Sequence, residues 1–169
     1  ADCYFMQKEY DKSLECYENA LSMFKNIDTV GRDHILENAH VMCMLGVSSF
    51  MLLMYSRAAS TFELALHMVK YAFALSNTFF HGLVLALMGI SFYKMRNYHR
   101  CVSMCFQSFE IFCAIHGDKL PELPKNKFWL VCQTLYVMGN SYNNLNLHQK
   151  AVKYLTVARS VLMASKNRD

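Results

Sequence analysis

Cysteine and histidine residues near the middle of the chain have spacing that could hold a metal ion. Cys101 and Cys105 stand four residues apart, so on a helix they would share one face, and His99 lies just before them. No second ligand pair lies at the spacing of a zinc finger. The competing interpretation places both cysteines in a helical core, because a buried cysteine behaves as a small apolar residue. We therefore predict no metal site and no cofactor.

Motifs for catalysis are missing from the sequence. It contains no HExxH or HxxxH pattern, no GxSxG motif and no Gly-rich phosphate loop. No arrangement of a nucleophile with a base stands out, although a site assembled from distant residues would leave no such motif. We predict that the chain has no catalytic residues and is not an enzyme.

Composition points to protein binding. Apolar residues make up 54% of the 169 residues and charged residues only 18%, against about 45–50% and 25% in typical soluble domains. Some of this apolar surface is therefore expected to face a partner. The net charge of +4 is mild, and no cluster of Lys and Arg is longer than two residues. This pattern predicts that nucleic acid is not a partner.

The same composition bears on location. The longest apolar run, residues 41–55, is interrupted by Gly and Ser and is shorter than the ~18 residues that a membrane span needs. No signal peptide is visible at the start. Seven cysteines at irregular spacing are typical of reduced thiols rather than of a disulfide framework. We predict a cytoplasmic protein with no membrane span.

A recurring pattern organises the chain into helix pairs. Residues 44–66 contain Gly46, Tyr55, Ala58, Phe62 and Ala65, and related spacings recur three times. The aligned glycine positions are occupied by Ala1, Gly46, Gly89 and Gly139, so the periods are 45, 43 and 50 residues. Such periods indicate a solenoid, in which each unit buries its apolar face against its neighbours. A small residue at these positions allows two antiparallel helices to cross closely.

Short polar segments predict the connections. Turns within pairs are expected at residues 7–9, 56–57 and 96–97 and at Asn146, and breaks between pairs at residues 26–31, 76–77 and 116–127.

These residues resemble the tetratricopeptide repeat family, whose pattern is a large apolar residue, Leu-Gly, an aromatic residue, and then Tyr, Ala, Phe and Ala. The second unit matches best and departs only at Ser49; the third has Cys101, Cys105 and Ser108 in the last three positions; and the fourth has His148 in place of Tyr. The resemblance covers nearly the whole chain. It implies an all-α fold, a right-handed superhelical solenoid of antiparallel helix pairs with about 3.5–4 repeats.

The repeats would lie at residues 1–31 (partial), 32–76, 77–117 and 125–166 of one domain spanning residues 1–169. They are longer than the usual 34 residues, similar in length to those of kinesin light chain and the LGN-type adaptors. Because the first unit begins at its glycine position, we expect the chain to be a fragment of a longer protein.

The resemblance also implies a concave groove lined by the first helix of each pair. Mapped residue by residue, the groove would be largely apolar in the second and third repeats and polar in the fourth. Its members are His40, Cys43, Val47, Phe50, Met51, Leu83, Ala86, Ile90, Tyr93, Lys94, Gln133, Tyr136, Asn140, Asn143 and Asn144.

Two features of this groove restrict the partner. Family members that hold the terminal carboxylate of a chaperone use basic and amide side chains at these positions. We predict that such a motif is not the ligand, because this chain has Cys43, Val47, Leu83 and Leu87 there. Asn140, Asn143 and Asn144 suit an extended peptide backbone. The competing interpretation is that these asparagines end a helix and form a turn.

The sequence thus predicts a non-catalytic adaptor or scaffold that binds an extended or helical protein segment in the groove. Three alternatives stay open. In the first, the chain is a structural module that builds a larger assembly through its helix faces. In the second, it is a regulatory appendage of an enzyme elsewhere in the protein. In the third, other parts of the same protein fill its apolar groove.

Overall fold

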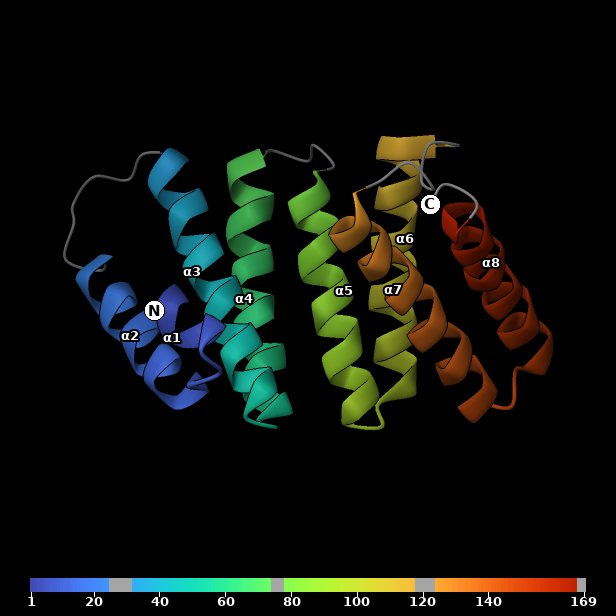
Figure 1. Ribbon diagram of the computed structural model, residues 1–169, viewed down its shortest axis with the longest axis horizontal. Coiled ribbons are helices and arrows are strands. Elements are labelled where there is room, and N and C mark those ends of the chain that lie inside the picture. The colour runs from blue at the N-terminus through green and yellow to red at the C-terminus, as the bar shows by residue number, and fades with distance from the viewer. Residues whose placement is uncertain (25–31, 74–77, 118–123, 167–169) are drawn as a thin grey trace. The chain divides into compact units, whose positions relative to one another are not determined.

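The computed structural model describes residues 1–24, 32–73, 78–117 and 124–166, and within these ranges it contains helices and no strands (Figure 1). The chain divides into two compact units, residues 1–76 and 77–169. The N-terminal unit contains α1 (Asp2–Met6), α2 (Tyr10–Phe24), α3 (Arg32–Met51) and α4 (Tyr55–Phe73). The C-terminal unit contains α5 (Phe79–Lys94), α6 (Tyr98–His116), α7 (Lys125–Asn144) and α8 (His148–Lys166).

Within each unit, helices that follow one another in the chain pack against one another. In the N-terminal unit α2 packs on α1 and α3, and α3 packs on α4. In the C-terminal unit α5 packs on α6, α6 on α7 and α7 on α8, and α7 also contacts α5. The predicted all-α class and the packing of consecutive helices are therefore confirmed, while the handedness and the number of repeats stay predictions.

Glycines mark the close crossing of the two helices within three of the pairs. A Cβ atom placed on Gly46 would lie 2.6 Å from the Phe62 ring, one on Gly89 would lie 2.5 Å from the Cys105 sulfur, and one on Gly139 would lie 2.6 Å from Leu155. Each glycine faces the residue sixteen positions later. Any larger residue would separate the helices, which is the physical reason for the small-residue pattern.

The turns inside the pairs share one backbone geometry. Lys8, Leu53, Arg96 and Asn146 all have positive φ, between 59° and 63°, and each stands seven residues after the aligned glycine position. In the second pair the turn is therefore Leu52–Met54, and the expectation of a turn at residues 56–57 is wrong, since Ser56 and Arg57 lie inside α4. That expectation relied on polarity, whereas the backbone register determines where the turn lies.

Side chains on either side of each turn hold the two helices together. Phe5 packs edge-on against Tyr10 with ring centroids 5.4 Å apart. Phe50–Tyr55 at 5.1 Å and Tyr93–Tyr98 at 6.0 Å repeat this contact at the same register. In the last pair these two positions are held by Asn143 and His148, which hydrogen-bond at 3.0 Å. We call this recurring contact the turn clasp.

Buried serines lie where one helix pair meets the next. Ser48 and Ser141 each follow an aligned glycine by two residues and are fully buried. Ser48 hydrogen-bonds Ser13 of α2 at 3.2 Å, and Ser141 donates to the Cys101 sulfur of α6 at 3.1 Å. Small side chains on both partners bring neighbouring pairs close together, and the hydrogen bonds satisfy the buried hydroxyl groups.

The predicted breaks at residues 26–31 and 76–77, and residues 118–123 of the third, lie outside the described residues. Among the helices of the described ranges, none combines the length and the apolar character needed to cross a membrane.

Candidate functional site

The last helix pair, α7 and α8, carries an open cavity. α7 begins after Pro124, and the pair turns at Asn146. Near this turn Gly139 brings the helices together against Leu155. Farther from the turn the pair differs from its predecessor: Gly82 of α5 admits the ring of Phe112, but the matching positions, fifty residues later, are Cys132 and Leu162. With no aromatic ring there, space remains along the two helices.

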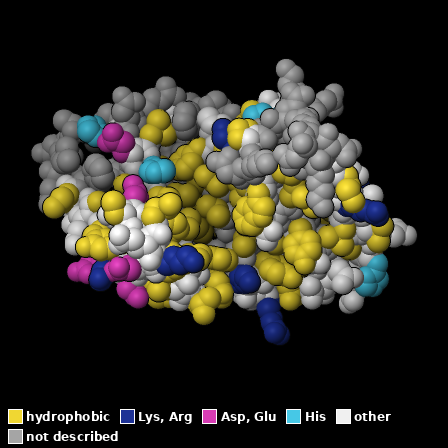
Figure 2. Space-filling view, viewed as in Figure 1, with side chains coloured by type: hydrophobic (Ala, Val, Ile, Leu, Met, Phe, Trp, Pro, Cys, Tyr) yellow, Lys and Arg dark blue, Asp and Glu magenta, His cyan; other side chains and the backbone are white. Residues whose placement is uncertain are grey.

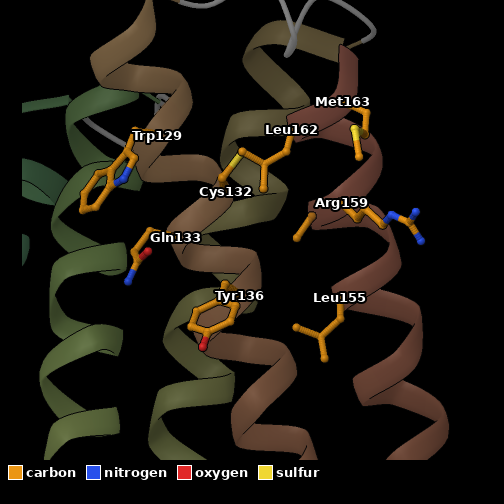
Figure 3. Close-up of a pocket in the computed structure, with 9 residues that line it drawn as sticks. Trp129, Cys132, Gln133, Tyr136, Leu155, Arg159, Leu162 and Met163 are labelled. Atoms are coloured by element: carbon orange, nitrogen blue, oxygen red, sulfur yellow. The ribbon is translucent and has the colours of Figure 1, made fainter. Parts of the chain in front are cut away.

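This space, which we call the α7–α8 trough, has a volume of about 540 Å³ (Figure 3). α7 contributes the side chains that run down one wall, Trp129, Cys132, Gln133 and Tyr136. α8 contributes the other wall, Leu155, Ala158, Arg159, Leu162 and Met163.

Large apolar side chains of the trough are open to solvent. Trp129 is 62% exposed, Tyr136 52%, Met163 50% and Leu162 44%. Burial of apolar surface is favourable by about 25 cal/mol per Å² covered. A partner that covers this cluster therefore gains binding free energy from each of these side chains. Exposed apolar clusters of this kind mark interaction sites.

The charge around the trough is positive. The guanidinium of Arg159 reaches outward from α8, away from α7 (Figure 3), and makes no ion pair within the described part of the chain. Helices α7 and α8 together carry six Lys and Arg residues and no Asp or Glu. Figure 2 shows the same asymmetry, with acidic side chains over the N-terminal helices and none visible over α7 and α8.

A second hollow, of about 350 Å³, lies between α6 and the α7–α8 pair. Tyr142 and Tyr154 stack in it with ring centroids 5.4 Å apart. Lys150 lies 5.7 Å from the centre of the Tyr142 ring, and Lys153 lies 5.7 Å from that of Tyr154. Such cation–π contacts occupy both lysines with the protein's own rings.

The groove residues predicted in the N-terminal unit lie on α3. His40 and Met51 are exposed, and Val47 and Phe50 are half-buried. Cys43 is buried, so its side chain offers a partner little contact surface. Burial also raises the pKa of its thiol to about 12, so the thiol is neutral near pH 7. Phe50 belongs to a turn clasp.

In the C-terminal unit the predicted groove residues lie on α5, in the trough and at the end of α7. On α5, Ala86 is buried, Lys94 is exposed, and the other three are half-buried: Leu83, Ile90 and Tyr93. Gln133 and Tyr136 of α7 lie in the trough.

The predicted asparagines make local hydrogen bonds at the end of α7. Asn144 donates to the Asn140 carbonyl at 2.8 Å, and Asn143 bonds His148 as the last turn clasp. Such local hydrogen bonds are expected if the asparagines end a helix and form a turn, which is the competing interpretation.

The cysteine pair lies inside the C-terminal unit. Cys101 and Cys105 are fully buried, with their sulfur atoms 3.9 Å apart. The hydrogen bond with Cys101, together with burial, raises the pKa of Cys105 well above its ordinary value. His99 is exposed. Across the described ranges no three His, Cys, Asp or Glu side chains are grouped to hold a metal ion.

Sequence reasoning missed most of the trough. The predicted groove does not include Trp129, Arg159, Leu162 or Met163, because it follows the first helices at fixed offsets and three of these residues lie on the second helix. The absence of acidic residues between positions 124 and 166 is a signal in the sequence that could have drawn attention to this pair.

Comparison with known proteins supports the fold alone. No protein-family model matches the chain, and no curated protein matches its sequence. A crystal structure of BtubC (BKLC) from P. vanneervenii aligns with 99% of this chain and 79% of that one, with a TM-score of 0.58 and 14% sequence identity. This likeness and the consecutive helix pairs fit a tetratricopeptide-like repeat fold, and the class that they define is that of helical repeat proteins.

Proposed function

We propose that this chain is a non-catalytic protein-interaction module, an adaptor or scaffold that binds an extended or helical segment of a partner protein. The observation that carries the proposal is the α7–α8 trough, where Trp129, Tyr136 and Met163 present apolar side chains that are half or more exposed. The helical repeat fold supports it, since such folds present helix faces as binding surfaces. Cytoplasmic location and the absence of a nucleic-acid partner are part of this proposal.

Substitution of Phe50 or Tyr93 would be a poor test of the predicted concave groove. Glu in place of Phe50 or Tyr93 would break a turn clasp, because each ring packs on a tyrosine across its turn. Loss of binding could then result from loss of structure. Tyr136 is a better choice, since it is 52% exposed and belongs both to the predicted groove and to the trough.

The test compares proteins captured from an extract by the full chain, by Tyr136→Glu and by a control, Val152→Glu, whose site on α8 is 65% exposed and outside the trough. We expect at least one protein to bind the wild type and the control alike and to be reduced about tenfold with Tyr136→Glu, as for a central interface residue. Circular dichroism confirms that both variants stay helical.

If Tyr136→Glu loses no captured protein, the proposal fails. If the wild-type chain instead forms assemblies in light scattering that Tyr136→Glu dissolves, the alternative of a structural module that builds a larger assembly gains support.

A further inference from the structure

The α7–α8 trough has an occupied counterpart in the same unit. Alignment of Gly89 with Gly139 relates α5–α6 to α7–α8 by fifty residues, so Phe79 corresponds to Trp129 and Cys101 to Ala151. On the earlier pair these positions are covered by α7: the Lys127 ammonium lies 4.6 Å from the centre of the Phe79 ring, and Ser141 donates to Cys101. α7 therefore lies across the α5–α6 pair, from Phe79 of α5 to Cys101 of α6.

Solvent exposure differs between the two aligned helix pairs. Ala86 of α5 is fully buried, but its counterpart Tyr136 is 52% exposed. Phe79 is half-buried beneath α7, but its counterpart Trp129 is 62% exposed. The trough thus continues, one pair further on, an interface that the fold already uses, and the shape that fills this interface is an α-helix about as long as the 20 residues of α7.

The charges indicate the chemistry of that helix. Its contact face must be apolar, because the trough is lined by apolar side chains apart from Gln133 and Arg159. Its flank meets the outward guanidinium of Arg159 on a helix pair with six basic and no acidic residues. Opposite charge at the rim of an interface speeds association and selects the partner.

We infer that the α7–α8 trough binds an acidic amphipathic α-helix of a partner protein. The inference rests on the proposed function and names the partner chemistry. The docked helix lays its apolar stripe between Trp129 and Met163, much as α7 lies on α5–α6, and places a carboxylate toward Arg159. Recognition by an apolar stripe in a groove is a general mode of helix binding.

The single tryptophan of the chain, Trp129, reports on the trough directly. Two synthetic 20-residue peptides without tryptophan, matched to the length of α7, share one Leu and Ala stripe at helical spacing. One is flanked by Glu and the other by Lys. We expect the Glu peptide to shift Trp129 emission to shorter wavelength in a saturable way, and to bind at least about tenfold more tightly than the Lys peptide.

Two variants of the full chain carry the same change in charge. Arg159→Glu should weaken the Glu peptide about tenfold and strengthen the Lys peptide. Lys70→Glu, at an exposed position on α4 that does not line the trough, should leave both affinities within about twofold, because an exposed charge that makes no contact with the peptide is screened by salt. Circular dichroism checks that both variants remain folded.

Several results would overturn the inference. They are equal affinity for the two peptides, equal effects of the two variants, or no emission shift with either peptide up to about 1 mM. A blue shift that grows with protein concentration alone, with a rising mass in light scattering, would assign the trough to a second copy of the chain. If the peptides fail while Tyr136→Glu still loses a captured protein, the proposed function stands and only the acidic helix is excluded.

Discussion

At the scale of single residues, the glycines have a tertiary role more than a local one. Glycine in the middle of a helix is unfavourable by about 1 kcal/mol relative to alanine, yet Gly46, Gly89 and Gly139 all lie inside helices. Each removes a Cβ that would collide with the partner helix of its pair. The helix crossing therefore outweighs the local preference.

Gly89 allows a direct test of this balance. A Cβ on Gly89 would lie 2.5 Å from the Cys105 sulfur, 3.3 Å from the Cys105 nitrogen and 3.4 Å from the Cys101 carbonyl oxygen. We expect Gly89→Ala to lower the free energy of unfolding by about 1–2 kcal/mol, because overpacking exceeds the gain in helix propensity. Urea denaturation measures the change.

The neighbouring cysteine provides the control. Cys105→Ala removes the sulfur that the new Cβ would meet, so the double variant should be less destabilised than the sum of the two single variants by about 1 kcal/mol. Strict additivity, or a Gly89→Ala protein more stable than the wild type, would show that the sulfur contact does not limit the crossing.

At the scale of elements, the recurring unit is a helix pair joined by a turn of fixed geometry. The residue with positive φ and the two residues of the turn clasp keep their register while their identities change. Leu53 occupies the same left-handed position as Asn146, although leucine is poorly suited to it and asparagine is tolerated there. The fold therefore imposes this turn on a sequence that does not favour it locally.

Exchange of the two turn residues tests this account. Leu53 is 70% exposed, so its side chain contributes little packing. We expect Leu53→Asn to raise the free energy of unfolding by about 1 kcal/mol and Asn146→Leu to lower it by about 1 kcal/mol. The Cβ of either residue crowds a carbonyl oxygen in a left-handed backbone, but only the short polar side chain of asparagine can compensate by hydrogen-bonding locally. Thermal denaturation followed by circular dichroism measures both. A stabilising Asn146→Leu would contradict the assignment of strain.

At the scale of the whole molecule, the chain consists of two compact units whose net charges have opposite signs. Residues 1–76 carry nine acidic and six basic residues, whereas residues 77–169 carry four acidic and eleven basic residues. The mild net charge of +4 is thus the sum of two contrasting halves. The net charge of the entire chain conceals this contrast.

The two units should respond separately to a core change in one of them. Gly46→Ala places a Cβ 2.6 Å from the Phe62 ring in the N-terminal unit. Trp129 reports on the C-terminal unit alone. In repeat folds stability is approximately a sum of local terms, so we expect the far-ultraviolet circular dichroism transition in urea to move to lower concentration or to split, while the Trp129 fluorescence midpoint stays in place. Equal movement of both signals would show that the chain unfolds as one unit.

The sequence by itself determined the helical class and the packing of consecutive helices. Helical periodicity, small residues at the aligned glycine positions and the lack of breakers are local properties, and they carry the fold. The sequence did not place the turn at Leu52–Met54, because that turn is built from leucines and methionine and lacks the polar signal.

Only the tertiary structure decided which surface stays open. Phe50 and Tyr93 are apolar groove candidates in the sequence, but each packs on a tyrosine across its turn. Trp129 and Met163 look like ordinary helix residues in the sequence, but they line a trough. The physical reason is that exposure depends on the next helix: α7 covers Phe79, whereas Trp129, at the same register fifty residues later, is 62% exposed.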